Sequence, residues 1–545
     1  MNKLIDNKSI DSVRRIINCA VIFSLFLIVL FTCPVGAATY YVKNGGNDSL
    51  SGLSDSNAWA TIAKVRATVS SGDIVYFRSQ DTWSGSSSPV LQATAGVTYW
   101  GTGYGSGTRA TIQATGTQAY GTVYLNVSNV NFYGFNVDMN SQNAGGIWIG
   151  TTSGDIQNIN VDNCEVHGSA GSGYAYGIYV GGYGTNTDVS NVQITNTLVH
   201  HTQHEGIAIY PTWGRDGNSA TNVTVRNCII HDTGLVGGVT WGDGIYIVNE
   251  LNNIYIEFNT IYDCPVGMRY GNSRDAYVGD PHNINIRYNI VYNCTYGIGM
   301  NFGSGGHNSS ANVYGNLLYE NQYGFNIGGT HSGSTFNYYN NTVYDNTHVD
   351  SNGVRNYLAG MTNSTLNFKN NIIVVNHADS YPIWIGTSGA EALWTHSNNL
   401  IYKSGSTTKW VYRDAVATYT NLQTKSTWDA TTVITNPSFT GGTRPTGFSG
   451  TYGTNMVPNT TYFALGSASP AINAGTTLGS SYNGCINGAG LATPITRPQA
   501  AAYDIGAYEY AESGGVVPPP VVTPPVVTPP VVTPPAAPKN LRVVE

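Results

Sequence analysis

A repeat of short strands constrains what this chain can fold into more than any other feature. Stretches with alternating apolar residues recur as "VTVRNCIIHD" from Val223, "IYIEFNTIYD" from Ile254, "INIRYNIVYN" from Ile284, "FNYYNNTVYD" from Phe336 and "LNFKNNIIVV" from Leu366. Each is followed by a second short strand of the form Gly-apolar-x-apolar, such as "EGIAIY" or "DGIYIV". The period is roughly 25 to 33 residues, and the pattern predicts a parallel β-solenoid in an all-β chain.

Stacked coils should place the residues of one column next to each other. Asparagines recur at one predicted turn, at positions Asn259, Asn289, Asn316, Asn341 and Asn371, where the earlier coils have Cys164, Thr197 and Cys228. Such a ladder lets each amide bond to the coils above and below. Two positions later, an inward apolar column is predicted at Val166, Val199, Ile230, Ile261, Val291, Leu318, Val343 and Ile373.

Two outward columns are predicted to be structural. One is a stack of side chains at Asp138, His167, His200, His231, Tyr262, Tyr292, Tyr319 and Tyr344. The other alternates in charge at Arg226, Glu257 and Arg287, which favours a ladder of ion pairs. His200 of "HHTQHE" therefore belongs to a stack with His167 and His231 in this interpretation. The histidines of this stretch lack the helical spacing of a zinc motif, so no metal ligand is assigned to them.

The repeat pattern resembles the right-handed parallel β-helix of the pectate-lyase-like superfamily over about residues 38–400. "TYYVKNGGNDSLSG", "AWATIAKV" and "GDIVYFR" are similar to its opening segment, which implies a short N-terminal capping helix. "SPAINAG" and "DIGAYEY" resemble the closing segment of bacterial secreted members. Polygalacturonase motifs are missing apart from "NTD" at Asn186, and "DPHN" at Asp280 matches an alginate-epimerase motif only in part. The resemblance therefore implies a fold, not an activity.

The composition of the two ends of the chain predicts segments that are not part of the solenoid. Residues 1–37 have a basic start, an apolar run and "PVGAA", which predicts a signal peptide and a secreted or cell-surface protein that does not span the membrane after cleavage. The further division is a cap with the first coil at 38–90, the β-helix at 91–400, a closing segment at 401–512, a Pro-rich linker at 513–538 and a stub resembling the start of a fibronectin type III module at 539–545.

Charge and cysteine content exclude several classes of protein. The formal net charge is −7 with only 10% charged residues, which argues against nucleic acid as a partner. Five cysteines follow residue 37 without a CxxC pair, and we expect them to be buried thiols and not a disulfide framework. We expect a monomer without a cofactor. Calcium stays open, although no obvious cluster of aspartates for it is found.

Catalytic candidates gather where the Gly-x strands of neighbouring coils begin. Glu205 and Asp243 fall in one column on adjacent coils, and two close carboxylates can divide into one acid and one base, as glycoside hydrolysis needs. In the alternative of a lyase, Arg269 would neutralise a uronate, and His204 or Tyr246 would remove the C5 proton. A pair of exposed acids at a turn is the structural alternative.

The outward column of the same strands suggests a sugar-binding groove. It reads Trp148, Tyr179, Ala208, Tyr246, Arg269, Gly299, Asn326 and Arg355. Tyr210, Trp213 and Trp241 border it, the tryptophans on the longest loops, where function concentrates. Two functions remain open: an extracellular enzyme that cleaves polysaccharide by hydrolysis or β-elimination, or a glycan-binding or structural surface protein without chemistry.

Overall fold

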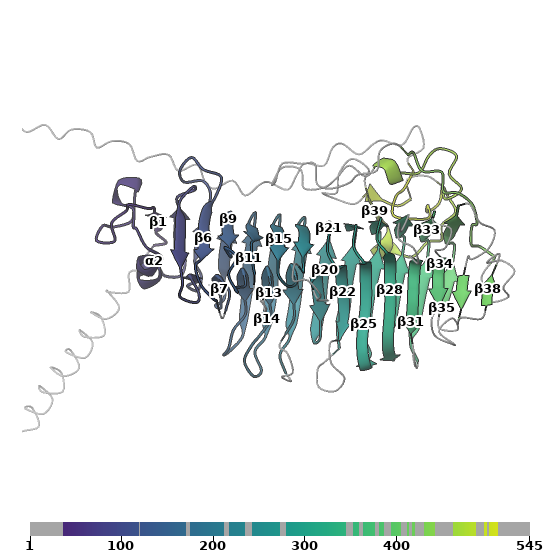
Figure 1. Ribbon diagram of the computed structural model, residues 1–545, viewed down its shortest axis with the longest axis horizontal. Coiled ribbons are helices and arrows are strands. Elements are labelled where there is room, and N and C mark those ends of the chain that lie inside the picture. The colour runs from purple at the N-terminus through teal and green to yellow at the C-terminus, as the bar shows by residue number, and fades with distance from the viewer. Residues whose placement is uncertain are drawn as a thin grey trace, which may run out of the picture.

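Three parallel β-sheets run along the computed structural model, and successive coils add one strand to each (Figure 1). Neighbouring coils pair in parallel, as when His167 of β12 lies opposite His200 of β15. This confirms the predicted all-β parallel solenoid. The structure describes residues 36–118, 120–170, 175–211, 217–234, 242–272, 280–344, 352–358, 363–376, 381–385, 394–404, 411–413, 417–419, 430–441, 461–486, 495–498 and 501–510.

The strands divide by sheet as follows. Sheet A contains β1 (Thr39–Val42), β2 (Ile74–Phe77), β5 (Thr98–Trp100), β8 (Val130–Tyr133), β11 (Ile156–Asp162), β14 (Val189–Thr195), β17 (Ala220–Arg226), β20 (Leu251–Glu257), β23 (His282–Arg287), β26 (Ser310–Tyr314), β29 (Thr335–Tyr339), β32 (Thr365–Lys369) and β35 (Trp394–Ser397). Sheet B contains β3 (Thr82–Gly85), β6 (Ala110–Ala114), β9 (Phe135–Asp138), β12 (Glu165–His167), β15 (Leu198–Thr202), β18 (Ile229–Thr233), β21 (Thr260–Tyr262), β24 (Ile290–Tyr292), β27 (Leu317–Tyr319), β30 (Thr342–Tyr344), β33 (Ile372–Val375) and β36 (Leu400–Lys403). Sheet C contains β4 (Leu91–Gln92), β7 (Val123–Leu125), β10 (Ile147–Ile149), β13 (Ile178–Val180), β16 (Ile207–Ile209), β19 (Asp243–Val248), β22 (Val266–Asn272), β25 (Tyr296–His307), β28 (Tyr323–Ser332), β31 (Asn352–Leu358), β34 (Tyr381–Ile385), β37 (Val411–Arg413) and β38 (Ala417–Tyr419), the last antiparallel to its neighbour.

A short helix lies at the N-terminal end of the solenoid (Figure 1). It is α2 (Ile62–Thr68), and the hydroxyl oxygen of Thr61 caps it by accepting a hydrogen bond from the backbone N–H of Lys64 at 3.1 Å. Val65 is buried and Ile62 packs against the solenoid core. The helix therefore covers apolar residues that no preceding coil can cover, and the predicted capping helix is confirmed. The short 3-10 helix η1 (Asp55–Asn57) precedes it.

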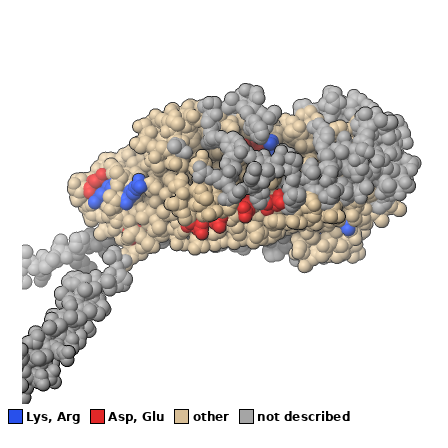
Figure 2. Space-filling model, turned by 90° about the horizontal axis from the view of Figure 1, so that it is seen from below, with Lys and Arg blue, Asp and Glu red and all other residues tan. Residues whose placement is uncertain are grey.

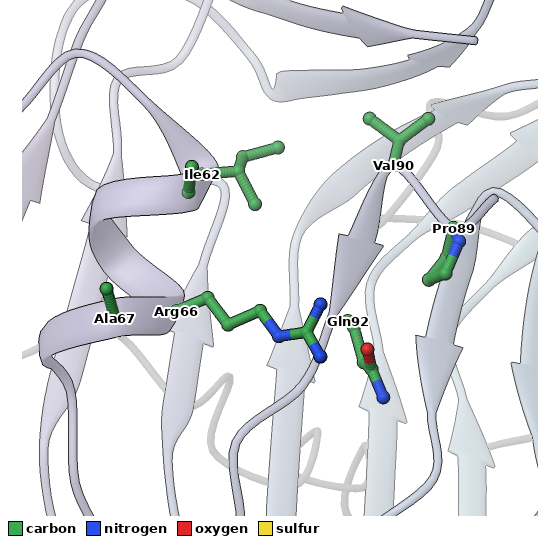
Figure 3. Close-up of a pocket in the computed structure, with 7 residues that line it drawn as sticks. Ile62, Arg66, Ala67, Pro89, Val90 and Gln92 are labelled. Atoms are coloured by element: carbon green, nitrogen blue, oxygen red, sulfur yellow. The ribbon is translucent and has the colours of Figure 1, made fainter. Parts of the chain in front are cut away.

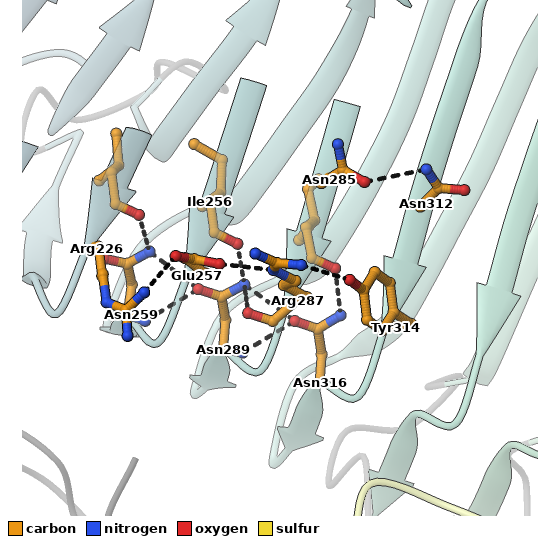
Figure 4. Close-up of polar contacts among 12 residues, drawn as sticks. Arg226, Ile256, Glu257, Asn259, Asn285, Arg287, Asn289, Asn312, Tyr314 and Asn316 are labelled. Atoms are coloured by element: carbon orange, nitrogen blue, oxygen red, sulfur yellow. Dashed lines mark hydrogen bonds and ion pairs between the residues drawn. The ribbon is translucent and has the colours of Figure 1, made fainter. Parts of the chain in front are cut away.

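The predicted asparagine ladder forms at the turn between sheets A and B (Figure 4). The Nδ2 of Asn259 donates to Oδ1 of Asn289 at 3.0 Å, and Asn289 donates to Asn316 at the same distance. Each Oδ1 also accepts from the backbone N–H of the preceding coil's asparagine. The ladder continues through Asn341 and Asn371 to Asn399, which the sequence reading had not included. Buried turn backbone is thereby hydrogen-bonded along most of the solenoid.

The remaining columns also follow the predicted register. All eight residues of the inward apolar column are completely buried. Glu257 accepts ion pairs from Arg226 at 2.7 Å and Arg287 at 2.6 Å, so the alternating charges form the expected ladder (Figure 4). The cysteines Cys164, Cys228, Cys264, Cys294 and Cys485 are buried and unpaired, as predicted.

A second asparagine ladder lies in sheet A and was missed. Its members Asn129, Asn158, Asn191, Asn222, Asn253 and Asn283 all have positive φ, and each side chain from Asn158 onward donates to the asparagine of the coil before it. Asparagine adopts this left-handed conformation more readily than most residues. Each member stands directly before an inward apolar residue, as in "NVTVR" and "NINIR", and that spacing could have revealed it. The "DPHN" asparagine, Asn283, is thus a ladder residue.

The closing segment packs over the C-terminal half of sheet B (Figure 1). It includes η4 (Thr461–Phe463), η5 (Ser480–Tyr482), β39 (Gly484–Cys485) and β40 (Ile495–Thr496). The ring of Phe463 lies 5.0 Å from that of Tyr319 and Tyr482 lies 4.9 Å from Tyr339, measured between centroids. Tyr319 of the predicted outward column is therefore fully buried at this end and Tyr344 is partly buried, while the histidines of the same column stay partly exposed.

Candidate active site

The candidate acids stand where two neighbouring coils enter sheet C. Glu205 and Asp243 directly precede Gly206 and Gly244, and the backbone N–H of Gly206 donates to the carbonyl oxygen of Asp243 at 2.9 Å. A Cβ at Gly206 would lie only 2.7 Å from the carbonyl oxygen of Gly244. Only glycine permits this approach of the two backbones. The repeated glycine thus places the two acids in one column on adjacent coils.

Both acids are buried, unlike the exposed pair that was the structural alternative. Glu205 is 5% exposed and Asp243 is 1% exposed. Oδ1 of Asp243 accepts an ion pair from Arg269 at 2.9 Å, and Nδ1 of His204 lies 3.3 Å from Oε2 of Glu205 without the alignment of a hydrogen bond. Within the described residues, Oδ2 of Asp243 and Oε2 of Glu205 have no hydrogen-bond partner. A buried polar atom left unpaired costs about 1–3 kcal/mol, so this pair calls for a reason other than stability.

The environment of Asp243 makes it a carboxyl that can hold a proton at neutral pH. Burial raises its pKa to about 7, and the negative charge of Glu205 adds to this effect. The Arg269 guanidinium opposes the shift but does not cancel it. A group with a pKa near the working pH can both give and take a proton, which is what general acid–base catalysis requires.

Arg269 links the acids to the aromatic column of sheet C. Its guanidinium carbon lies 5.8 Å from the centroid of the Tyr246 ring, while the same side chain pairs with Asp243. Burial, followed by the charge of Asp243, raises the pKa of Tyr246 well above its usual range. Tyr246 therefore keeps its proton at neutral pH and does not serve as a base in the resting protein. The structure brings the predicted residues His204, Glu205, Asp243, Arg269 and Tyr246 into a chain of contacts.

The aromatic residues predicted to line a groove pack against one another. The rings of Trp148 and Tyr179 lie 4.4 Å apart, and the hydroxyl of Tyr179 donates to the carbonyl oxygen of Tyr210 at 2.6 Å. Tyr210 in turn contacts Tyr246 edge to face at 5.8 Å. All four side chains are less than one-tenth exposed, so little of each ring is accessible for stacking on a sugar. Trp213 and Trp241, predicted to border the groove, lie outside the described residues.

Two further features of the described surface, a depression near the N-terminal helix and the charge of one face, do not indicate another catalytic site. A depression between α2 and β4 is lined by Ile62, Arg66, Pro89, Val90 and Gln92, and has neither a carboxylate nor a histidine in its lining (Figure 3). The described surface seen in Figure 2 is largely uncharged, with acidic side chains in a few small groups. Charge therefore provides no broad attraction for a polyanion on this face.

The histidines of "HHTQHE" take two roles that the sequence did not separate. His167, His200 and His231 stack at centroid distances of 5.0 and 5.1 Å, and Tyr262 continues the stack at 4.8 Å. The predicted stack is thereby confirmed. His201 stands outside it, perpendicular to His200, and lies near Asp232 of the next coil. Neither His201 nor Asp232 was singled out from the sequence, although both directly follow stack residues.

The sequence matches the family description "Right handed beta helix region" over residues 54–278 and 146–347, which together span more than half of the 545 residues. The chain belongs to the right-handed β-helix family. The handedness expected from the resemblance is therefore shown together with the fold. No curated protein sequence matches significantly.

Several solved structures are similar to this right-handed β-helix protein at low identity. Pectate lyase Pel9A has 16% identity and a TM-score of 0.47, over 87% of this chain and 96% of its own. The A-module of the mannuronan C-5 epimerase AlgE6 from Azotobacter vinelandii has 14% identity and a TM-score of 0.42, over 69% and 92%. The GH136 lacto-N-biosidase from Eubacterium ramulus has 14% and 0.38, over 69% and 65%. These values describe a shared fold.

Nothing in the described part of the chain could serve as a membrane-crossing helix, since none there is both long and apolar enough. The signal peptide predicted at residues 1–37 lies outside the described residues up to position 35. The Pro-rich linker at 513–538 and the stub at 539–545 lie outside them entirely.

Proposed function

We propose that this right-handed β-helix protein is a secreted enzyme that binds a polysaccharide over sheet C and hydrolyses it. Asp243 is the general acid and Glu205 is the general base or nucleophile. The observation that carries the proposal is the buried acid pair on adjacent coils, in which each carboxylate keeps one oxygen without a hydrogen-bond partner among the residues that the structure describes. Because the pKa of Asp243 is raised to about 7, this carboxyl can hold the proton that a leaving sugar oxygen needs.

Hydrolysis fits this arrangement better than β-elimination. In a lyase, a cation must neutralise the substrate's uronate, but Arg269 already pairs with Asp243 at 2.9 Å. Tyr246 holds its proton firmly because it is buried beside Asp243. Arg269 is thus committed to Asp243 and Tyr246 to its own proton, whereas each acid has one oxygen without a hydrogen-bond partner among the described residues, at which a proton can be exchanged.

Binding without chemistry is the second candidate, and the packing of the aromatic column favours it. Trp148 and Tyr179 are 7% and 4% exposed, which suits a rigid surface patch as well as a row of sugar subsites. A surface or matrix protein needs only such a patch, with the Asp243–Arg269 pair as a buried structural contact.

A panel of neutral and uronate-containing polysaccharides distinguishes the candidates. We expect new reducing ends without the ultraviolet absorbance of unsaturated products, and loss of the reducing-end signal in Asp243→Asn. Asp155→Asn is the matched control, because Asp155 is an exposed carboxylate on the solenoid away from the pair. Unsaturated products would contradict hydrolysis and indicate β-elimination. Retention in affinity electrophoresis without any turnover would contradict an enzyme and indicate a glycan-binding protein.

A further inference from the structure

A second cluster of chemistry-bearing side chains lies on sheet B, which the acid pair does not use. It occupies the ends of the neighbouring strands β15 and β18, where His200 lies opposite His231. The residues that follow, His201 and Asp232, both have φ of +50°. The strands are interrupted there, because Thr202 and Thr233 point inward again and are buried. Each coil therefore presents two consecutive outward side chains in place of one.

Three of these side chains offer ligand atoms at one point. One atom each from His201, His231 and Asp232 lie within 4.8 Å of one another. Nδ1 of His231 is 2.7 Å from Oδ2 of Asp232, and the His201 ring stands nearly perpendicular to the His231 ring at 81°. Two imidazoles and a carboxylate are a ligand set that divalent transition metals prefer, with solvent completing the coordination.

A chain of contacts behind the cluster fixes the proton positions of the imidazoles. Nε2 of His200 lies 3.4 Å from Oε1 of Glu165, and Nδ1 of His200 lies 2.7 Å from Nδ1 of His201. If Nε2 of His200 donates to the carboxylate, its Nδ1 accepts, so Nδ1 of His201 must donate. Nε2 of His201 then has a free lone pair. Carboxylate and imidazole partners orient metal-binding histidines in this way.

Packing explains the stacked rings but not these two residues. The stack accounts for His200 and His231, whereas His201 and Asp232 lie beside it. In the next coils, the same column holds Asp263 and Asn293, whose side chains hydrogen-bond to each other. Other coils thus pair their column residues by hydrogen bonding, whereas the His201 coil places an imidazole opposite a carboxylate and a second imidazole.

We propose that His201, His231 and Asp232 form a binding site for a divalent transition-metal ion such as Zn²⁺, which joins two neighbouring coils of sheet B. The ion replaces the contact between His231 and Asp232 with one bond to each and adds a bond to His201. If Nδ1 of His231 is the ligand, the neutral imidazole carries its proton on Nε2 after exchange with solvent, so that Nδ1 offers its lone pair. The site is independent of the proposed hydrolase, since its three residues lie on another sheet.

The solenoid itself supplies conservative variants for a test. Tyrosine follows His231 in the stack at Tyr262, and asparagine occupies the column of His201 and Asp232 at Asn293. His231→Tyr, His201→Asn and Asp232→Asn therefore introduce residues that other coils already hold in the same conformation. His167→Tyr is the matched control, because His167 belongs to the stack but not to the cluster.

The experiment titrates the full chain, prepared without a histidine tag, with Zn²⁺ by calorimetry and with Co²⁺ by visible absorption. We expect one equivalent of either ion, and binding weakened at least about 10-fold in each cluster variant, with His167→Tyr unchanged. Melting curves without metal verify that every variant is folded, and His201→Asn remains informative because its side chain is exposed. Absence of stoichiometric binding by the wild type, or an equal loss in His167→Tyr, overturns the proposal.

Discussion

Two sets of buried polar side chains in this solenoid differ in how far their hydrogen bonds are completed. In the asparagine ladder, Asn289 is fully buried, donates to Asn316 and accepts from Asn259. In the acid pair, Glu205 and Asp243 are almost as buried, but each leaves one oxygen without a hydrogen-bond partner in the described structure. The ladder lowers the free energy of the fold, whereas the acid pair raises it and keeps reactive atoms available.

The largest effect is expected when the ionisable carboxyl groups of the acid pair are replaced by amides. Asp243→Asn or Glu205→Gln keeps the shape but cannot exchange a proton, so we expect turnover to fall by about 10²–10⁴. The melting temperature should stay the same or rise, because a buried charge is lost. Initial rates on the responsive polysaccharide and melting curves measure both. Full activity in both variants would show that the pair is a structural contact.

The pH dependence of the free energy of unfolding tests the same difference between the acid pair and the asparagine ladder. The pKa of Asp243 is raised to about 7 from 3.8, so the folded state binds this proton more tightly than the unfolded state. Its contribution to stability is fully present below pH 4 and is lost as the pH rises to 7. The difference between wild type and Asp243→Asn should therefore change by a few kcal/mol over this window. Chemical denaturation at several pH values measures it, and a flat difference contradicts the raised pKa.

Breaking the ladder should cost stability and leave chemistry alone. Asn289→Leu removes the amide that accepts from the backbone N–H of Asn259 and donates to the carbonyl oxygen of Ile256, so we expect a loss of about 1–3 kcal/mol. The activity per folded molecule should not change. Denaturant unfolding with a parallel assay tests this, and an unchanged midpoint would contradict the hydrogen-bonded register.

The smallest effect is expected from the ring stack. His200→Ala removes one ring between His167 and His231 and should cost about 0.5–1.5 kcal/mol. His200→Tyr restores a planar ring, as Tyr262 does in the same column, and should recover most of this loss. Thermal unfolding compares the two variants. Loss of polysaccharide turnover in both would move the active site from the acid pair to the histidines.

Sequence periodicity predicted most of the features that repeat from coil to coil. A column of residues spaced by one coil must become a column in space, since parallel strands lie about 4.8 Å apart. The asparagine ladder, the inward apolar column, the ring stack and the Arg226–Glu257–Arg287 ladder all followed from this rule. The second ladder through Asn158 and Asn191 was missed because a left-handed residue interrupts the strand alternation on which the reading relied.

The sequence by itself determined the coils and their register, and the tertiary structure decided which side chains lose water and which meet across columns. The alternation of "HHTQHEGIAIYP" places Glu205 in a column but does not predict its burial, because burial depends on neighbouring side chains that the pattern of one coil does not specify. The pairing of Arg269 with Asp243 connects different columns of adjacent coils, and His201 and Asp232 of one column meet His231 of the neighbouring stack. Such contacts depend on side-chain directions and backbone interruptions that a coil-to-coil period does not specify.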